Sequence, residues 1–259
     1  MITELQNRNT NESNRLSFIK LLPNILTIIS LCCGMTAIKY ALNSHWENAL
    51  LAIIVAACFD VLDGATARLL KATSRFGAEL DSLADAVNFG VIPSVIIYFW
   101  LKDTTGTAFD SYFLGWTWVA CTLFTACCLL RLARFNIMDQ SSDNRESANS
   151  FFVGVPSPAG GVLILMPLIF ELTDLNFNFD IKNITPYFTI LIAILLVSKV
   201  PTLSLKKISV SPKTTVFILL GIGIIFISLL YFTFETLLVF GLIYLFSIPV
   251  SIFMYRNRN

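Results

Sequence analysis

The chain has 259 residues, of which 56% are hydrophobic and only 14% charged, and its mean hydropathy is +0.74. This composition is too apolar for a soluble domain of this length and is typical of a polytopic membrane protein. A net charge of +1 leaves no strongly basic surface, so we expect no nucleic-acid partner.

Apolar runs long enough to cross a bilayer recur along the chain and predict an all-α, polytopic membrane fold. A window of about 19 residues finds about eight such runs. In chain order they cover residues 21–42, 46–71, 79–101, 111–135, 158–173, 185–204, 214–233 and 236–255, and the fifth is the weakest. The polar residues 1–16 that precede them are expected to be a disordered cytoplasmic segment.

The basic residues indicate how the chain is oriented. If both termini lie on one side of the membrane, all 18 Lys and Arg residues except Lys39, Lys102 and Lys182 fall on that side. The positive-inside rule therefore places both termini in the cytoplasm, together with the turn that carries Lys71 and Arg75. We expect a protein of the inner, cytoplasmic membrane whose active site faces the cytoplasm.

The second and third runs carry four aspartates in a regular pattern. Asp60 and Asp63 are three residues apart and Asp81 and Asp85 are four apart, so each pair shares one face of a helix. A short turn between the helices lets the two pairs face each other. Carboxylates inside a membrane are costly and mark functional sites. Oxygen ligands without a nearby His or Cys suit two Mg²⁺ or Mn²⁺ ions better than Zn²⁺.

Ion pairs are the alternative explanation for these aspartates. Asp63 with Arg68, and Asp81 with Arg75, would form a purely structural network. The same face also carries residues with little or no side chain, which leave room for a ligand: Gly64, Ala67 and Gly77. This spacing of small residues favours a binding site over an ion-pair network.

The complete pattern resembles the signature of the CDP-alcohol phosphotransferases, integral membrane enzymes that replace the CMP of a CDP-linked lipid by an alcohol. It reads Asp60-x-x-Asp63-Gly64-x-x-Ala67-Arg68 and, after eight intervening residues, Gly77-x-x-x-Asp81-x-x-x-Asp85. Every fixed position is present at the family spacing. The resemblance implies a helical core with six spans, assigned here to residues 17–204, and makes residues 205–259 an addition of two further spans.

Flanking segments resemble the phosphatidylserine synthase branch of this family. They are Pro23-Asn24-x-x-Thr27, the run from Asp81 to Pro93, the run from Arg131 to Asn136 and the run from Phe152 to Pro158. One position departs from the branch, because Ser30 stands where Asn is usual, which puts one contact in doubt. The resemblance implies CDP-diacylglycerol and L-serine as substrates, membrane lipid as the surroundings and a homodimer as the assembly.

The resemblance also assigns roles to the signature residues. Asp60, Asp63 and Asp81 would hold the metal ions, and Asp85 would complete the second metal site and act as the general base. CDP-diacylglycerol would bind against the small and basic residues of the signature: Gly64, Ala67, Arg68 and Gly77. Arg68 could instead anchor the cytoplasmic end of its helix.

Two arginines at the end of the fourth run are candidates for binding the carboxylate of serine. Arg131 and Arg134 are three residues apart and therefore share a helical face. They could equally contact the diphosphate or act as positive-inside anchors.

Polar residues elsewhere in the apolar runs have two interpretations each. Asn24 and Thr27 could reach the nucleotide or cap the first helix. Asn88 lies seven residues after Asp81 on the same face and could orient a ligand or bridge two helices. The sequence does not decide between these roles.

Two other functions fit parts of the sequence. The first is the same reaction with choline, inositol or glycerol 3-phosphate as acceptor. A choline site would need an aromatic box and a phosphorylated acceptor would need additional Arg or Lys, and neither is evident. The second is a cation-coupled transporter, but residues 130–259 contain no acidic pair that matches the first, as an internal repeat would require.

Overall fold

The computed structural model describes residues 2–103, 108–140, 151–173, 180–198, 201–203 and 212–256. The helices are α1 (Ile2–Leu42), α2 (Trp46–Leu69), α3 (Arg75–Asp85), the π-helix η1 (Ala86–Val91), α4 (Ile92–Asp103), α5 (Ala108–Gln140), α6 (Ser157–Ile164), α7 (Met166–Glu171), α8 (Ile181–Val197), α9 (Pro212–Tyr231) and α10 (Thr233–Arg256). Two three-residue strands, β1 (Phe151–Val153) and β2 (Pro201–Leu203), pair in antiparallel fashion. The chain divides into two compact units, residues 1–92 and 93–259, and the predicted all-α membrane fold is confirmed.

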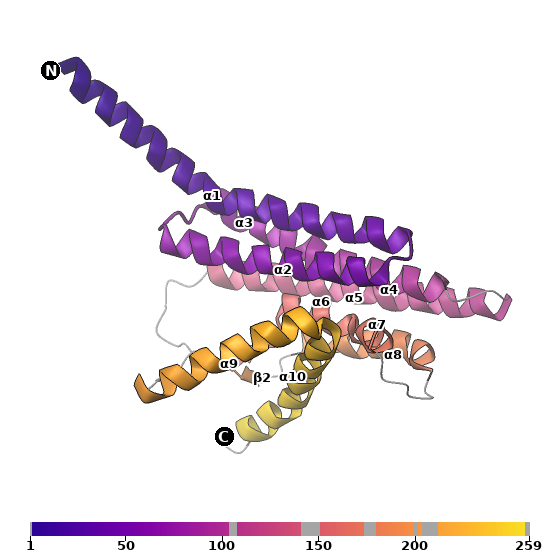
Figure 1. Cartoon of the computed structure of the whole chain (residues 1–259). Helices are drawn as coiled ribbons and strands as arrows, with labels where there is room; N and C mark the ends of the chain where they lie inside the picture. Colours follow the sequence, from indigo (N-terminus) through magenta and orange to yellow (C-terminus); the bar gives the residue numbers. More distant parts are fainter. Residues whose placement is uncertain are drawn as a thin grey trace. The chain divides into compact units, whose positions relative to one another are not determined.

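In the first unit, α1 and α2 lie side by side (Figure 1). The face of α1 that is buried recurs every three or four residues and consists mostly of small side chains: Pro23, Thr27, Ser30, Gly34, Ala37 and Ala41. Small residues allow two helix backbones to approach closely. This close packing stabilises helix association in a membrane, where the surrounding lipid is as apolar as the side chains and the hydrophobic effect does not drive the helices together. The buried face of α2 includes Ile53, Ala56 and Asp63, so a carboxylate is part of this interface.

Helix α1 includes residues 2–16 of the segment for which disorder was expected, and that expectation stays a prediction. Helix α1 already begins at Ile2, and residues 2–22 contain neither Gly nor Pro to interrupt it. Pro23 therefore lies inside a helix and does not begin one. A proline in a helix interior bends it, and α1 changes direction along its length in Figure 1.

Five helices of the described residues are long and apolar enough to cross a membrane. They are Leu21–Leu42, Trp46–Leu69, Arg75–Asp103, Tyr112–Ile137 and Thr233–Ile252, and α8 is a shorter apolar helix. The expected run 158–173 is not one continuous helix. It folds as the two short helices α6 and α7, with Leu165 between them and Pro167 at the start of α7. The expected run 185–204 also ends earlier, since α8 stops at Val197 and residues 201–203 form a strand.

The segment before α6 makes a turn at a glycine whose φ is positive. Gly154 has φ +83°, and a Cβ there would lie 3.0 Å from the Ser198 carbonyl oxygen and 3.1 Å from that of Leu196. The close approach to the end of α8 and the left-handed backbone both require glycine. This turn leads the chain from β1 into the buried Ser157 at the start of α6.

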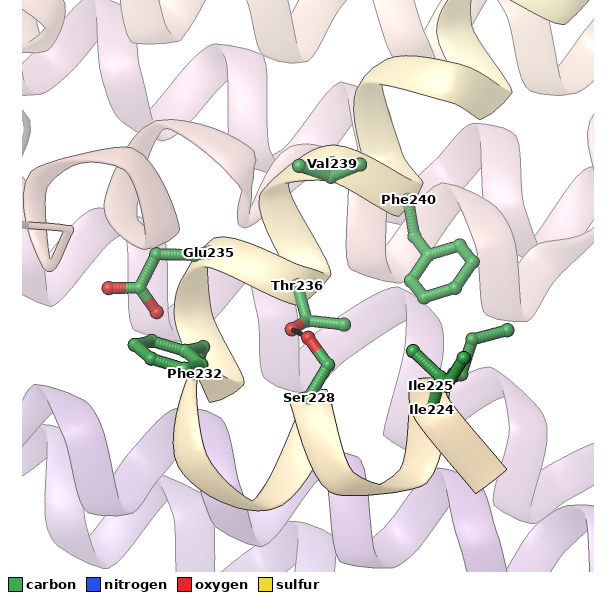
Figure 2. Close-up of a pocket in the computed structure, with 8 residues that line it drawn as sticks. All are labelled: Ile224, Ile225, Ser228, Phe232, Glu235, Thr236, Val239 and Phe240. Carbon is green, nitrogen blue, oxygen red and sulfur yellow. Dashed lines mark hydrogen bonds between the residues drawn. The ribbon is translucent and has the colours of Figure 1, made fainter. Parts of the chain in front are cut away.

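The last two helices, α9 and α10, form a hairpin with a cavity of about 400 Å³. Figure 2 shows the hydroxyls of Ser228 and Thr236 facing each other across the hairpin, and their oxygens are 2.7 Å apart. The other lining residues are largely apolar, with Glu235 as the charged exception. The hydrogen bond satisfies both hydroxyls in otherwise apolar surroundings.

Candidate metal and phosphate site

A tight turn joins the two helices that carry the aspartates. Helix α2 ends at Leu69 and α3 begins at Arg75, so a short turn separates them, as expected. Lys71 adopts a left-handed conformation with φ 49°, and the Ser74 hydroxyl caps α3 by accepting a hydrogen bond from the Gly77 amide at 3.0 Å. The turn reverses the chain, so the aspartates of the two helices can meet.

Three of the four predicted aspartates converge. One carboxylate oxygen each from Asp60, Asp63 and Asp81 lies within 4.8 Å of the others. At that separation two unit charges repel by about 3 kcal/mol at an effective dielectric constant near 20. The cluster therefore needs protons or a cation between its carboxylates.

Asp85 lies at the edge of this cluster. Its carboxyl group is within hydrogen-bonding reach of the Asp60 carboxyl, and it is outside the group of three. The other oxygen of Asp85, Oδ1, is buried and has no hydrogen-bond partner among the described residues. Asp85 thus combines contact with the cluster and an acceptor oxygen that is available to another group.

Thr27 on α1 holds one member of the cluster in place. Its hydroxyl donates to Asp63 Oδ2, with the two oxygens 2.5 Å apart, and lies 3.1 Å from the Pro23 carbonyl oxygen. Thr27 and Asp63 are 4% and 3% exposed, so this contact is shielded from solvent. A hydrogen bond to a charged group is stronger than a neutral one and restricts the rotation of the carboxylate.

A second polar contact ties both aspartate helices to α1. The Ser30 hydroxyl donates to the Ala56 carbonyl oxygen at 2.7 Å, one turn before Asp60, and Asn88 Nδ2 donates to Ser30 Oγ at 2.9 Å. Asn88 is in η1, the helix that begins immediately after Asp85, and the Asn88 side chain is 1% exposed. Gly34 makes room for it, because a Cβ on Gly34 would overlap Asn88 Oδ1. Asn88 therefore bridges helices, and Ser30 takes part in the contact despite its departure from the branch pattern.

Within the described residues, no ion pair within 4.0 Å accounts for these aspartates. Among the side chains that the structure describes, the salt bridge found is Lys182 with Glu171, at 2.8 Å in the second unit. The geometry thus gives no support to the alternative network of Asp63 with Arg68 and Asp81 with Arg75. Carboxylate oxygens alone form the donor set, which is the set that hard divalent cations prefer.

The spacing of the oxygens also fits such an ion. Oxygens that bind one Mg²⁺ lie about 3–4 Å apart, because each metal–oxygen distance is about 2.1 Å. The three oxygens within 4.8 Å need only a small contraction to reach this spacing. The cluster could therefore hold a metal ion.

The small residues of the signature divide into two kinds. A Cβ added to Gly64, one turn after Asp60, would meet nothing within 4 Å, so space is open beside the cluster. A Cβ on Gly77 would lie 2.8 Å from Asn24 Oδ1 on α1, which makes Gly77 a helix-packing position. Ala67 is half-buried and Arg68 is exposed at the end of α2. Open space for a ligand lies at Gly64 and not at Gly77.

Arg131 and Arg134 belong to the second unit. Arg131 is half-buried and its Nη1 donates to the Ser157 hydroxyl at 2.8 Å, whereas Arg134 is exposed. The two side chains therefore have different surroundings although they are three residues apart on α5. Their predicted role in serine binding remains a prediction.

Thr27 and Ser30 have partners that the sequence did not predict, because Thr27 was expected to reach the nucleotide or cap the first helix and instead donates to Asp63. Their spacing from Asn24 is three and six residues along an otherwise apolar helix, which places the three polar groups on one side of α1. That stripe was the available signal. Its partners, Asp63 and Asn88, lie 36 and 58 residues away in sequence.

Comparison with known proteins adds a family match and a set of relatives. Residues 20–197 match the family model described as CDP-alcohol phosphatidyltransferase. The match ends with the last residue of α8, so the α9–α10 hairpin lies outside it.

The relatives are proteins named CDP-diacylglycerol–serine O-phosphatidyltransferase. The chain is 35% identical over 243 residues to the one from Mycobacterium leprae (strain TN), which covers 93% of this chain and 77% of the relative. It is 31% identical over 245 residues to the one from Helicobacter pylori (strain ATCC 700392 / 26695), which covers 92% and 97%. It is 38% identical over 194 residues to the one from Mycobacterium tuberculosis (strain ATCC 25618 / H37Rv), covering 75% and 65%. The resemblance seen in the signature is confirmed.

Proposed function

We propose, from the premise that this chain belongs to the CDP-alcohol phosphatidyltransferase family, that it transfers the phosphatidyl group of CDP-diacylglycerol to L-serine and releases CMP. The names of its relatives support serine as the acceptor. The observation that carries the chemistry is the convergence of the Asp60, Asp63 and Asp81 oxygens within 4.8 Å. The product is phosphatidylserine, formed in the membrane in which this integral membrane protein resides.

The aspartates supply the binding site for two Mg²⁺ or Mn²⁺ ions. Asp60, Asp63 and Asp81 would hold them, with Asp85 completing the second position. When bound, such ions neutralise the diphosphate and stabilise the negative charge on the departing CMP. Thr27 keeps Asp63 in one orientation, so the site is ready before the substrate arrives.

Asp85 is the candidate general base. A serine hydroxyl is a weak nucleophile, so a carboxylate that accepts its proton assists attack on the lipid-linked phosphorus. A new oxygen–phosphorus bond then forms to serine, and the bond to the CMP oxygen breaks with its electron pair leaving on CMP. Asp85 Oδ1, which has no partner within the described residues, is the acceptor suited to this proton. Transfer is direct and needs no covalent enzyme intermediate.

The residues after the first aspartate pair would contact the nucleotide lipid. Gly64 has no neighbour that a Cβ would meet within 4 Å, and it lies next to the cluster. Ala67 continues the same side of α2, and the exposed guanidinium of Arg68 can pair with phosphate oxygens. Gly77 contributes indirectly by allowing α3 to pack against Asn24.

We also propose the orientation and the assembly. The distribution of Lys and Arg supports a cytoplasmic position for both termini and for the turn at Lys71, so the substrate would enter from the inner leaflet of the cytoplasmic membrane. The assembly would be a homodimer, as is usual in the family.

The test is CMP release by the purified full-length protein in micelles that contain CDP-diacylglycerol and Mg²⁺ or Mn²⁺. L-serine, choline, inositol and glycerol 3-phosphate are offered separately, and release with serine alone is the expected result. EDTA should abolish release, and added Mn²⁺ or Mg²⁺ should restore it. Release with a different acceptor would refute the serine assignment, and no release with any acceptor from folded protein would favour a transporter.

A further inference from the structure

The span that carries Asp81 and Asp85 changes its winding directly after Asp85. Helix α3 ends at Asp85, the π-helix η1 covers Ala86–Val91, and α4 begins at Ile92. Each N–H of a π-helix bonds to the fifth preceding carbonyl instead of the fourth, and single π-turns within α-helices occur frequently at functional sites. Pro93, in the first turn of α4, has no N–H to continue the α-helical ladder, so the sequence favours an interruption here.

The π-turn sends the side chains before and after it in different directions. In a continuous α-helix, Asp85 and Ile92 are seven residues apart and would share one face. One additional residue in a turn rotates the side chains after it by about 100° relative to those before it. Asp81, one α-helical turn before Asp85, has an oxygen within 4.8 Å of oxygens of both α2 aspartates. Ile92 lies against α1, because a Cβ on Gly34 would be 2.8 Å from Ile92 Cδ1. The aspartate side of the span therefore meets α2, whereas the side with Ile92 meets α1.

Asn88 connects the π-turn to α1 and α2. It lies in the middle of η1 and is 1% exposed. Asn88 Nδ2 donates to Ser30 Oγ at 2.9 Å, and the Ser30 hydroxyl donates to the Ala56 carbonyl oxygen of α2 at 2.7 Å. Ala56 is one turn before Asp60. One amide thereby sets the position of η1 relative to the helix that carries the first pair of aspartates.

The amide of Asn88 is energetically costly at this position. Its oxygen, Oδ1, is buried and has no hydrogen-bond partner among the described residues, and it occupies space that the side chain missing from Gly34 leaves open. A buried acceptor without a partner costs about 1–3 kcal/mol, and an apolar side chain of similar size would avoid that cost. The hydrogen bond from the other end of the amide to Ser30 therefore explains Asn88 better than packing alone.

We infer that Asn88 is a positioning residue for Asp85: its hydrogen bond to Ser30 fixes the π-turn, and the fixed turn directs the Asp85 carboxylate to the aspartate cluster. Asp85 is the last residue before the turn and is three residues from Asn88, so a return to α-helical winding would change the direction of one of the two side chains. This inference rests on the proposed function, in which Asp85 completes the second metal position and accepts the proton of serine. Thr27 would then orient the α2 side of the cluster and Asn88 the α3 side.

The first test compares Ser30→Ala with a matched control in the full-length protein. Ser30→Ala removes the hydroxyl that accepts from Asn88 and leaves every aspartate in place. We expect kcat for CMP release to fall about tenfold and the KM values for L-serine and CDP-diacylglycerol to stay within about twofold, because Asp85 acts in the transition state. The control is Ser94→Ala, since Ser94 is also a buried serine whose hydroxyl donates to a carbonyl oxygen of another helix, that of Cys121, at 3.2 Å. It should lower the thermal unfolding midpoint to a similar extent and leave kcat unchanged.

A second measurement needs no turnover. The rise of the thermal midpoint on addition of Mn²⁺ reports metal binding to the folded protein. Asn88→Leu and Asp85→Asn should each reduce this rise, and the double variant should reduce it no further than Asp85→Asn alone, because Asn88 acts only through Asp85. Ser30→Ala, the smaller change, takes the place of Asn88→Leu in this comparison if the leucine variant does not fold.

Each other outcome has a defined meaning. An unchanged kcat in Ser30→Ala, with wild-type turnover on serine intact, would overturn this inference and leave the proposed function standing. An equal loss of kcat in Ser94→Ala, or a Mn²⁺ response of the double variant below that of Asp85→Asn, would show a general packing defect and overturn it as well. Wild-type protein that releases no CMP with serine would refute the proposed function, and the inference with it.

Discussion

The α1–α3 region and the α9–α10 hairpin show two ways of packing apolar helices. Between α1 and its neighbours, small residues allow close approach, and Thr27, Ser30 and Asn88 form hydrogen bonds between helices. In the hairpin, the hydrogen bond between Ser228 and Thr236 lies beside a cavity of about 400 Å³. Lipid provides no hydrophobic force between helices, so close packing and hydrogen bonds set their geometry. Three such hydrogen bonds join the helices of the region that positions the aspartates, and four substitutions test the contrast with the hairpin.

The largest effect is expected for Asp81→Asn in the aspartate cluster. Loss of one charged ligand should lower turnover by about a thousandfold, the factor that ~4 kcal/mol of lost stabilisation produces. CMP release measures turnover, and the thermal unfolding midpoint in detergent shows whether the protein is folded. Glu79→Gln, an exposed position on the same helix, is the control and should retain activity. Near-normal turnover of Asp81→Asn would refute the metal assignment.

Gly34→Ala should break the close packing itself. The new Cβ would overlap Asn88 Oδ1, and relief of the overlap should cost about 1–3 kcal/mol of stability. The measurement is the thermal unfolding midpoint, which should fall together with turnover. Gly64→Ala is the matched comparison, because its Cβ meets nothing within 4 Å. It should leave the midpoint unchanged and raise the KM for CDP-diacylglycerol, and equal midpoints for both variants would contradict the packing argument.

Thr27→Val should loosen one aspartate without unfolding the protein. Valine keeps the shape and removes the hydroxyl that donates to Asp63, so we expect about a tenfold loss of turnover. The Mn²⁺ concentration for half-maximal activity should rise as well, which a general packing defect would not cause. Thr36→Val is the control, because the Thr36 hydroxyl donates to the Cys32 carbonyl oxygen within its own helix and is exposed. If the metal requirement of Thr27→Val matches that of the wild type, Thr27 does not position Asp63.

Ser228→Ala should have the smallest effect. It removes the hydrogen bond across the hairpin, which contributes about 0.5–1.5 kcal/mol, and leaves the aspartate region intact. The thermal midpoint should fall slightly while turnover stays at the wild-type value. A large loss of turnover would show that the two regions are coupled and would remove the contrast between them.

Much of the site could be predicted because its spacing is local. The three-residue and four-residue intervals of the aspartates place each pair on one side of a helix, and after the short turn at Lys71 the structure brings Asp60, Asp63 and Asp81 together. The contact between Thr27 and Asp63 could not be predicted, since it joins residues 36 positions apart through the packing of α1 on α2. Gly77 shows the same limit, because only the neighbouring Asn24 identifies it as a packing position.

Hydropathy predicted where most spans lie but not how they end. Runs 21–42 and 46–71 correspond closely to helices, because length and apolarity alone decide whether a segment can cross a bilayer. The run 158–173 became two short helices, and the run 185–204 ended at Val197. These interruptions depend on Pro167, on Gly154 and on the pairing of β1 with β2, which hydropathy does not register.

The sequence by itself determined that this is an all-α membrane protein, which family it belongs to and that aspartates of two successive helices lie close together, because periodicity, composition and short spacings are local properties of a chain. The tertiary structure decided which polar groups orient those aspartates, and that Gly77 packs while Gly64 faces open space. Those features depend on contacts between residues distant in sequence. Helix periodicity does not specify such contacts, since it says which residues share a face but not which helix that face meets.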